Sequence, residues 1–188
     1  MSTFDIDSLL RKTGALLQGH FKLRSGLHSD HFFQAALVFQ YPEIAAEICT
    51  VLANKAESLM AETVVSPALG GIIVGYELAR VLGLKAIFAE KESDQLVLRR
   101  GFELKKGEKV LIAEDVTTRG GRVQQTIDLA RGHGAKVVGV AVIVDRSGGE
   151  VTFDVPVFSL TKLDLPTYEP ESCPLCAAGV PLVSPGSK

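Results

Sequence analysis

The sequence predicts an α/β fold, with a central, mostly parallel β-sheet flanked by helices. Short β-branched or apolar runs alternate with longer segments of helical periodicity, and repeated strand–helix–strand units favour a parallel sheet. The run Val137–Val144 is almost continuously apolar, which is typical of a strand buried on both faces. No internal repeat or linker divides the chain.

The individual elements follow in order from these patterns. Ser8–Leu17 is expected to form a short amphipathic helix that is broken near Gly14. Pro42 suits the first turn of a helix, and apolar residues then recur at helical spacing as far as Leu59. The remaining expected elements are strands at Thr63–Val65, Ala86–Ala89, Val110–Ala113, Val137–Val144 and Val157–Leu160, helices at Ile72–Leu82 and Gly121–His133, and a loop at Pro67–Gly71.

Composition narrows the class of protein. Of the 188 residues, 46% are hydrophobic and 22% are charged, which is typical of one ordinary globular domain. No apolar run is long enough to cross a bilayer, and the N-terminus lacks a basic-then-apolar signal, so we expect a cytoplasmic protein without membrane contact. The net charge of −2 argues against a nucleic-acid partner. Ten of the 20 Lys and Arg residues lie between Arg80 and Arg122, which suits a phosphorylated ligand.

The stretch Val110–Gly121, VLIAEDVTTRGG, is the most informative motif. A buried strand leads into two adjacent carboxylates, Glu114 and Asp115, and then into a Thr/Gly-rich turn before a helix. Backbone N–H groups of such a turn and the helix N-terminus suit a phosphate. The carboxylates would repel that phosphate, but they can accept hydrogen bonds from the vicinal hydroxyls of a ribose. A plain helix cap would explain one acidic or hydroxyl residue but not the whole set.

This motif resembles the phosphoribosyl diphosphate (PRPP) signature of the type I phosphoribosyltransferases. The resemblance implies that Glu114 and Asp115 hold the ribose hydroxyls, with Asp115 also a catalytic candidate. It implies that the next residues wrap the 5-phosphate. These are Val116, Thr117, Thr118, Arg119, Gly120, Gly121 and Arg122. Mg²⁺ is implied as cofactor, since it binds diphosphate and hydroxyl oxygens through few protein ligands.

By the same resemblance, residues 1–188 form a single phosphoribosyltransferase domain. Its core is expected at about 41–160, and segments at about 1–40 and 160–188 are expected to form a small hood. The loop Ser66–Gly71, SPALGG, lies after the first core strand, and its small residues allow backbone to approach a diphosphate. Many orotate phosphoribosyltransferases have a lysine at the position of Gly70. Backbone groups of Ala68, Leu69 and Gly70 are therefore expected to bind PRPP.

The segment Glu90–Lys109 departs from the alternating pattern. Its spaced apolar residues are Leu96, Leu98, Phe102 and Leu104. They predict a two-stranded excursion with Arg99-Arg100-Gly101 at its tip. In the resembled family a mobile loop here closes over the diphosphate, often reaching the neighbouring subunit of a dimer. Lys91, Arg99 and Arg100 are therefore catalytic candidates, and a plain exposed hairpin is the alternative.

The segment Gly19–Gln34, GHFKLRSGLHSDHFFQ, resembles the hood of orotate phosphoribosyltransferases, where a basic residue precedes Ser-Gly and two aromatic residues follow. By this match Arg24 is a PRPP-binding candidate in place of the usual lysine. Phe32 and Phe33 match the aromatic pair beside the pyrimidine. Because neighbours on a strand face opposite sides, we expect one ring in the site and one in the interior.

Arg146 follows Asp145 at the end of the strand Val137–Val144. A planar guanidinium can pair with a carboxylate through two parallel hydrogen bonds, and orotate is a pyrimidine that carries a carboxylate. Orotate phosphoribosyltransferases have an Asp-Arg pair at this place, and their residue equivalent to Thr118 touches both the phosphate loop and the base. Arg146 and Thr118 are thus orotate-binding candidates. An Asp-Arg dipeptide that only opens a turn is the alternative.

Cys173 and Cys176 form a CxxC pair near the C-terminus. A structural zinc site usually needs four ligands, and the four histidines are not expected to cluster near this pair. We therefore assign no metal ligand and expect two reduced, partly buried thiols that pack the tail. Zinc completed by a second subunit is the minor alternative.

Taken together, the resemblance covers nearly the whole chain and implies an orotate phosphoribosyltransferase of de novo pyrimidine biosynthesis. Its substrates would be PRPP and orotate, and its assembly a homodimer. Displacement at the anomeric carbon relies on positioning and electrostatics, which agrees with the lack of an evident nucleophile-and-base pair. Two alternatives stay open: a phosphoribosyltransferase for another base, and a PRPP-sensing regulator without turnover.

Overall fold

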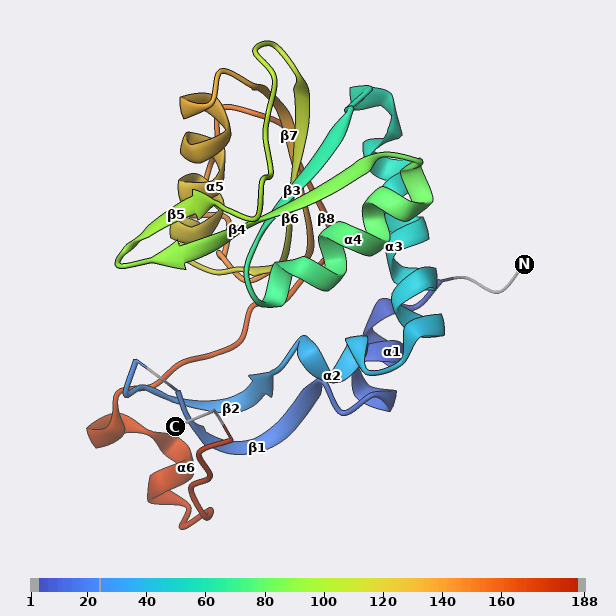
Figure 1. Ribbon diagram of the computed structural model, residues 1–188. Helices are drawn as coiled ribbons and strands as arrows, with labels where there is room; N and C mark the ends of the chain where they lie inside the picture. Colours follow the sequence, from blue (N-terminus) through green and yellow to red (C-terminus); the bar gives the residue numbers. More distant parts are fainter. Residues whose placement is uncertain (1–3, 24, 186–188) are drawn as a thin grey trace. The chain divides into compact units, whose positions relative to one another are not determined.

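The structure is a computed structural model that describes residues 4–23 and 25–185 (Figure 1). The chain divides into two compact units. The terminal unit takes its residues from Met1–Gln40 and Asp164–Lys188, and the core unit is Tyr41–Leu163. That the terminal unit acts as a hood stays a prediction. Within the described ranges, no helix is both long and apolar enough to span a membrane.

A six-stranded sheet forms the centre of the core unit, with strand order β5-β4-β3-β6-β7-β8. Its strands are β3 (Thr63–Pro67), β4 (Lys85–Glu92), β5 (Gln95–Leu98), β6 (Lys109–Thr117), β7 (Lys136–Asp145) and β8 (Val157–Lys162). Every neighbouring pair is parallel except β4 and β5. The predicted α/β fold with a mostly parallel sheet is confirmed, although most strands run further than their apolar stretches.

Helices cover both faces of this sheet: α3 (Pro42–Ala56) and α4 (Gly70–Leu82) lie on one face and α5 (Gly121–Gly132) on the other (Figure 1). A short 3₁₀ turn, η1 (Glu57–Leu59), follows α3. Pro42 is the first residue of α3, as expected from its fixed φ. Gly83 ends α4 in the left-handed conformation, with φ of 68°.

The order of the strands creates a topological switch point at the carboxyl end of the sheet. From β3 the chain crosses through α4 to β4, whereas from β6 it crosses through α5 to β7 on the opposite side. The direction of crossover therefore reverses between β3 and β6, which are direct neighbours. Open α/β sheets bind ligands at such a switch point, outside the carboxyl ends of the strands.

The terminal unit is built on an antiparallel hairpin of β1 (Leu16–Lys22) and β2 (His28–Phe33). Two helices, α1 (Ile6–Lys12) and α2 (Ala36–Phe39), flank the hairpin in sequence. The C-terminal tail carries η2 (Pro170–Ser172) and α6 (Pro174–Ala177), and it pairs with both strands through isolated bridges between Phe21 and Val183 and between His28 and Tyr168.

One predicted boundary in this unit was wrong. The first helix ends at Lys12, and Leu16 and Leu17 belong to β1 instead. Gly14 adopts a φ of 72°, which stops the helix, and the two leucines then face opposite sides of a strand, Leu16 buried and Leu17 exposed.

Candidate active site

Three strand ends bring the predicted site residues of the core unit to one edge of the sheet. β3 ends at Pro67, β6 at Thr117 and β7 at Asp145. Thr117 lies opposite Asp145 in the ladder, and the backbone N–H of Arg146 donates to the Thr117 carbonyl at 2.8 Å. The loop after β3, the loop after β6 and Arg146 therefore gather at the switch point.

The acidic pair lies within β6. Glu114 is 5% exposed, and Asp115 is half-buried. A Glu114 carboxylate oxygen accepts from the Asp115 N–H at 3.1 Å, and Asp115 accepts from the Val116 N–H at 2.7 Å. In the part of the chain that the structure describes, no Lys, Arg or His forms an ion pair with either carboxylate.

Burial and mutual repulsion set the charge of this pair. Desolvation, followed by the nearby Asp115 carboxylate, raises the pKa of Glu114, and desolvation also raises the pKa of Asp115. Both shifts favour the protonated form, so we expect the two carboxyls to share a proton when no ligand is bound. A ligand that brings hydroxyl donors or a cation would favour release of that proton.

The N-terminus of α4 packs directly on the acidic pair. A Cβ on Gly70 would lie 2.5 Å from Asp115 Oδ2, and one on Gly71 would lie 2.9 Å from Glu114 Oε1. A side chain at position 70 or 71 would therefore require the carboxylates to shift. The preceding loop is anchored by the Ala68 N–H, which donates to the Ala89 carbonyl at 2.8 Å.

The loop after β6 has the features of an anion site. Gly120 adopts a φ of 71° and begins α5 without a side-chain cap, so the first N–H groups of this helix are available to a ligand. Thr117 Oγ1 is buried and has no hydrogen-bond partner in the described structure. Thr118, Arg119 and Arg122 are exposed beside it. An unpartnered buried hydroxyl next to a free helix N-terminus is suited to a phosphate.

Arg146 presents a second unsatisfied group at the same edge. Its Nε is buried without a hydrogen-bond partner, and among the described residues its guanidinium forms no ion pair. Desolvation lowers the pKa of Arg146, which shows that this positive charge is held at a cost. A planar carboxylate is the group that would best satisfy it.

The prediction that basic residues form the tip of the hairpin was wrong. The turn of the β4–β5 hairpin is at Ser93 and Asp94, and Arg99, Arg100 and Gly101 form a second turn after β5. Leu96 and Leu98 do belong to a strand, β5, but this strand pairs with the C-terminal part of β4. Arg100 and Gly101 then adopt φ of 57° and 74°, which ends the extended backbone.

Each basic candidate of this hairpin already has an acidic partner on it. The Arg100 guanidinium donates two hydrogen bonds to the Glu90 carboxylate, of 2.7 and 3.1 Å. The remaining pairs are Arg99 with Glu92 and Lys91 with Asp94, both at 3.2 Å. All three basic side chains are more than half exposed, so these pairs are weak and can exchange for a more strongly charged ligand.

Other predicted site residues belong to the terminal unit. Arg24 lies outside the described residues. Phe33 is buried within this unit, and Phe32 is half-buried with its ring centroid 5.8 Å from that of Phe21. The assignment of one ring to orotate stays a prediction.

The prediction about the histidines was wrong. His20 and His28 lie against Cys173 and Cys176, with ligating atoms of all four within 4.8 Å of one another. The two histidines are on opposite strands of one hairpin, separated by the Ser-Gly turn. That arrangement was the available signal, but only the fold reveals that the tail returns to it.

Comparisons with known proteins agree with this geometry. Residues 37–169 match the model of the phosphoribosyl transferase domain. The orotate phosphoribosyltransferase of Carboxydothermus hydrogenoformans is 52% identical over the full length of both chains, and that of Thermotoga maritima is 50% identical over 97% of this chain and 98% of its own. The crystal structure of orotate phosphoribosyltransferase from Aeropyrum pernix has a TM-score of 0.71 at 23% identity, covering 85% of this chain and 94% of its own.

Sequence similarity over the whole chain and the same fold therefore lead to one conclusion: the chain belongs to the type I phosphoribosyltransferases and, among them, to the orotate phosphoribosyltransferase family.

Proposed function

We propose that this chain transfers ribose 5-phosphate from PRPP to orotate, giving orotidine 5′-monophosphate and diphosphate for pyrimidine synthesis. The observation that carries the proposal is the set of unsatisfied groups at the carboxyl edge of the sheet. Within the described residues, an acidic pair without an ion-pair partner, a buried hydroxyl without a hydrogen-bond partner and a buried guanidinium without an anion lie at one switch point. Their chemistry matches the ribose, the phosphate and the orotate carboxylate in turn.

We assign the ribose 5-phosphate half of PRPP to β6 and the loop that follows. Glu114 and Asp115 would accept hydrogen bonds from the ribose hydroxyls once the pair has lost its shared proton. The 5-phosphate would accept hydrogen bonds from the buried Thr117 hydroxyl and from the free N–H groups between Thr118 and Arg122. Held in this way, the anomeric carbon is fixed relative to the incoming base, so positioning supplies much of the rate.

We assign the diphosphate to the Ala68–Gly70 backbone and to the β4–β5 hairpin. Lys91, Arg99 and Arg100 would exchange their acidic partners for the leaving group, which carries more charge than a single carboxylate. Arg24 is kept as a further PRPP-binding candidate on its sequence match alone. The base would bind through its carboxylate to Arg146, with Thr118 beside it, and Phe32 and Phe33 are kept as orotate-binding candidates on their sequence match alone.

Mg²⁺ is the proposed cofactor, since this family is generally Mg²⁺-dependent. The acidic pair fits it, because a buried and a half-buried carboxylate that form no ion pair among the described residues favour a bound divalent ion. When bound with PRPP, Mg²⁺ would neutralise negative charge on the diphosphate and hydroxyl oxygens. Cytoplasmic location stays a prediction.

A homodimer is also proposed. Three apolar side chains at the start of α4 support it: Leu69, Ile73 and Tyr76 are 83%, 47% and 66% exposed. Light scattering of the full chain should give twice the monomer mass. A monomer mass at concentrations where the chain is active would remove the need for a partner subunit.

The decisive test of the reaction is the ultraviolet absorbance of orotate mixed with the protein, PRPP and Mg²⁺. We expect the orotate band to decrease only when all three are present, and no turnover with adenine, hypoxanthine or uracil. An unchanged band, with PRPP still binding by calorimetry, would favour another base or a regulator without turnover.

A further inference from the structure

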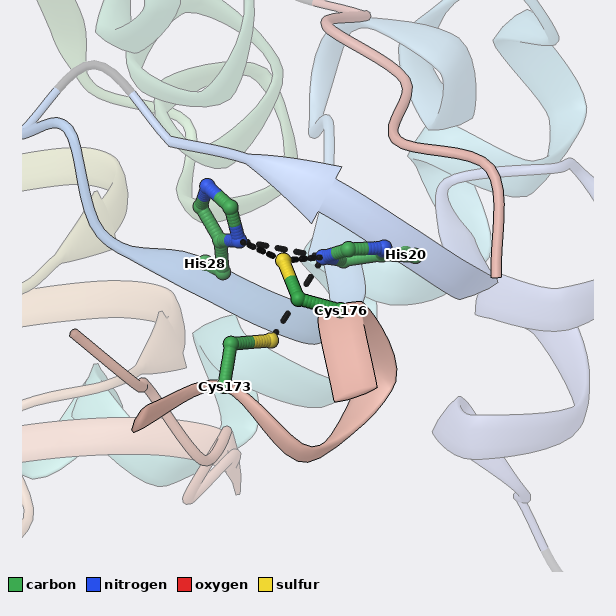
Figure 2. Close-up of side chains that lie close together, drawn as sticks. All are labelled: His20, His28, Cys173 and Cys176. Atoms are coloured by element: carbon green, nitrogen blue, oxygen red, sulfur yellow. Dashed lines mark hydrogen bonds between the residues drawn. The ribbon is translucent and has the colours of Figure 1, made fainter. Parts of the chain in front are cut away.

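Four side chains from distant parts of the sequence converge within the terminal unit (Figure 2). His20 comes from β1 and His28 from β2, while Cys173 directly precedes α6 and Cys176 lies in it. His20, His28 and Cys173 are buried, and Cys176 is exposed.

The spacing of the four ligating atoms is that of a small tetrahedron. His20 Nε2 lies 3.1 Å from His28 Nδ1, and the sulfur–nitrogen distances are 3.5, 3.7 and 3.3 Å. For zinc bonds of about 2.05 Å to nitrogen and about 2.3 Å to sulfur, tetrahedral geometry requires edges of about 3.3 Å between nitrogens and about 3.6 Å between nitrogen and sulfur. These four of the six edges therefore match a central zinc ion, and the two remaining edges, from Cys173 Sγ to His28 Nδ1 and to Cys176 Sγ, are within 4.8 Å.

The tautomer of His20 is already the one that a metal needs. Its Nδ1 lies 2.8 Å from the Val180 carbonyl oxygen, which can only accept, so Nδ1 must carry the proton. Nε2 then presents its lone pair to the centre of the cluster. Metal-binding histidines are typically oriented by such a hydrogen bond from the other ring nitrogen to a carbonyl.

Hydrogen bonding within the cluster does not account for this arrangement. Nε2 of His20 has one lone pair, yet His28 Nδ1, Cys173 Sγ and Cys176 Sγ all lie within 3.7 Å of it. A disulfide does not account for it either, because both cysteines are free thiols. A single cation in the centre would satisfy all four groups at once.

The backbone also holds the ligands in place. A β-bulge between Gln18 and Phe21 places two successive residues, His20 and Phe21, on the buried side. The Val183 N–H donates to the His20 carbonyl at 2.9 Å, and His28 exchanges two backbone hydrogen bonds with Tyr168 at 2.9 and 2.8 Å. The tail is therefore fixed to both strands next to the ligands.

We propose that His20, His28, Cys173 and Cys176 bind one Zn²⁺ ion that has a structural role. Two imidazoles and two thiolates are a typical zinc ligand set, and four protein ligands leave no open position for catalysis. Binding would release one proton from each thiol and leave both histidines neutral. The ion would join the hairpin to the tail in a unit whose core is small, where such cross-links add most to stability.

The first test is elemental analysis of the full chain, purified under reducing conditions without chelator and without a histidine tag. We expect about one zinc per chain, and a tetrahedral visible spectrum with thiolate charge transfer when Co²⁺ replaces zinc. A protein that contains no zinc and, after reduction, binds neither ion would overturn the proposal. Stoichiometric iron in place of zinc would overturn the choice of metal.

Variants then assign the ligands. Cys176→Ser, at the exposed ligand, should bind zinc at least tenfold more weakly, and His28→Ala should do the same. Matched controls are Cys49→Ala, at a buried thiol in α3, and His133→Ala, at an exposed histidine, and both should keep the zinc. Equal zinc content in ligand and control variants would contradict the assignment. If a ligand variant does not fold, the cobalt spectrum of the unaltered chain decides alone.

Loss of the ion should also be visible in stability. Chelation should lower the Tm of the unaltered chain but not that of folded Cys176→Ser. Because none of the four ligands is assigned to orotate or PRPP, zinc content and orotate turnover test separate proposals.

Discussion

Two glutamates near opposite ends of β6 have opposite electrostatic surroundings. Glu108 directly precedes the strand and accepts hydrogen bonds from Thr63 Oγ1 at 2.5 Å, from Lys85 Nζ at 2.8 Å and from the Lys105 N–H at 2.7 Å. Glu114, near the other end, has a second carboxylate beside it and forms no ion pair among the described residues, with only a weaker, opposing effect of the Arg122 charge on its pKa.

The two pKa shifts follow from this contrast. At Glu108 desolvation opposes ionisation, but the hydrogen bonds from Lys105, Lys85 and Thr63 outweigh it and lower the pKa to about 2. At Glu114 desolvation and the Asp115 charge act together and raise the pKa. The protein itself supplies the donors that stabilise the charge of Glu108. The charge of Glu114 would have to be stabilised by a ligand. The difference separates a structural end of the sheet from a binding end.

The largest expected effect comes from Asp115→Asn at the binding end. The substitution keeps the shape but removes the charge that would accept a ribose hydroxyl, and charge-assisted hydrogen bonds contribute about 1.5–3 kcal/mol. We expect kcat/KM for PRPP to fall about 100-fold with little change in Tm. Asp128→Asn, at an exposed carboxylate of α5, is the control. Unimpaired use of PRPP by Asp115→Asn would remove this residue from the site.

Arg146→Ala should have the next largest effect and be selective for orotate. Loss of the guanidinium removes the proposed partner of the orotate carboxylate, but alanine also relieves the cost of burying an unpaired charge. We therefore expect KM for orotate to rise about 10- to 30-fold. PRPP binding, measured by calorimetry, should be unchanged. Arg131→Ala, at an arginine paired with Asp154 at 2.9 Å, should affect neither substrate.

Glu108→Gln tests the structural end. A folded-state pKa of about 2, below the ordinary 4.5, means that ionised Glu108 stabilises the fold above pH 4.5, and that this contribution is lost as pH falls toward 2. We expect the variant to lose about 2 kcal/mol of unfolding free energy at pH 7 and almost nothing near pH 2. Urea titrations at both pH values measure this, with exposed Glu103→Gln as control. A loss that is independent of pH would show that packing, not charge, is responsible.

Glu114→Gln should give the smallest effect, a change in the pH dependence of the unfolding free energy. Because its folded-state pKa is raised, Glu114 favours the fold below its ordinary pKa of 4.5, and this contribution is lost as pH rises toward the raised value. The unaltered chain should thus lose about 1 kcal/mol more unfolding free energy than Glu114→Gln between pH 6 and pH 8. Parallel pH profiles for the two proteins would contradict a shared proton in the pair.

Much of the core unit could be predicted from the sequence because its signals are local. Continuous apolar runs predicted the central strands, Pro42 and Gly83 marked helix ends, and the motif after Val110 predicted the strand that carries the acidic pair, although β6 continues past the pair to Thr117. Strand lengths were less accurate. β4 and β6 extend through polar residues, whose side chains carry no period-2 signal although their backbone stays in the ladder.

What the sequence did not reveal depends on contacts between distant segments. The acidic partners of Arg99 and Arg100 follow from the register of β4 and β5, which the alternating leucines alone do not set. The contacts of Gly70 with Asp115 and of His20 with Cys173 join segments that are far apart in the sequence. No local spacing rule contains that information, so the histidine–cysteine cluster was missed.

The pairing of the hairpin with the tail also has a consequence for protein synthesis. The β1–β2 hairpin leaves the ribosome before the core unit, yet Val180, which orients the His20 ring, follows 160 residues after His20. The core unit lies wholly between them and has all its strands before the tail emerges. Folding during translation should therefore run from the middle of the protein outward, with the first-made hairpin among the last parts to reach its native contacts.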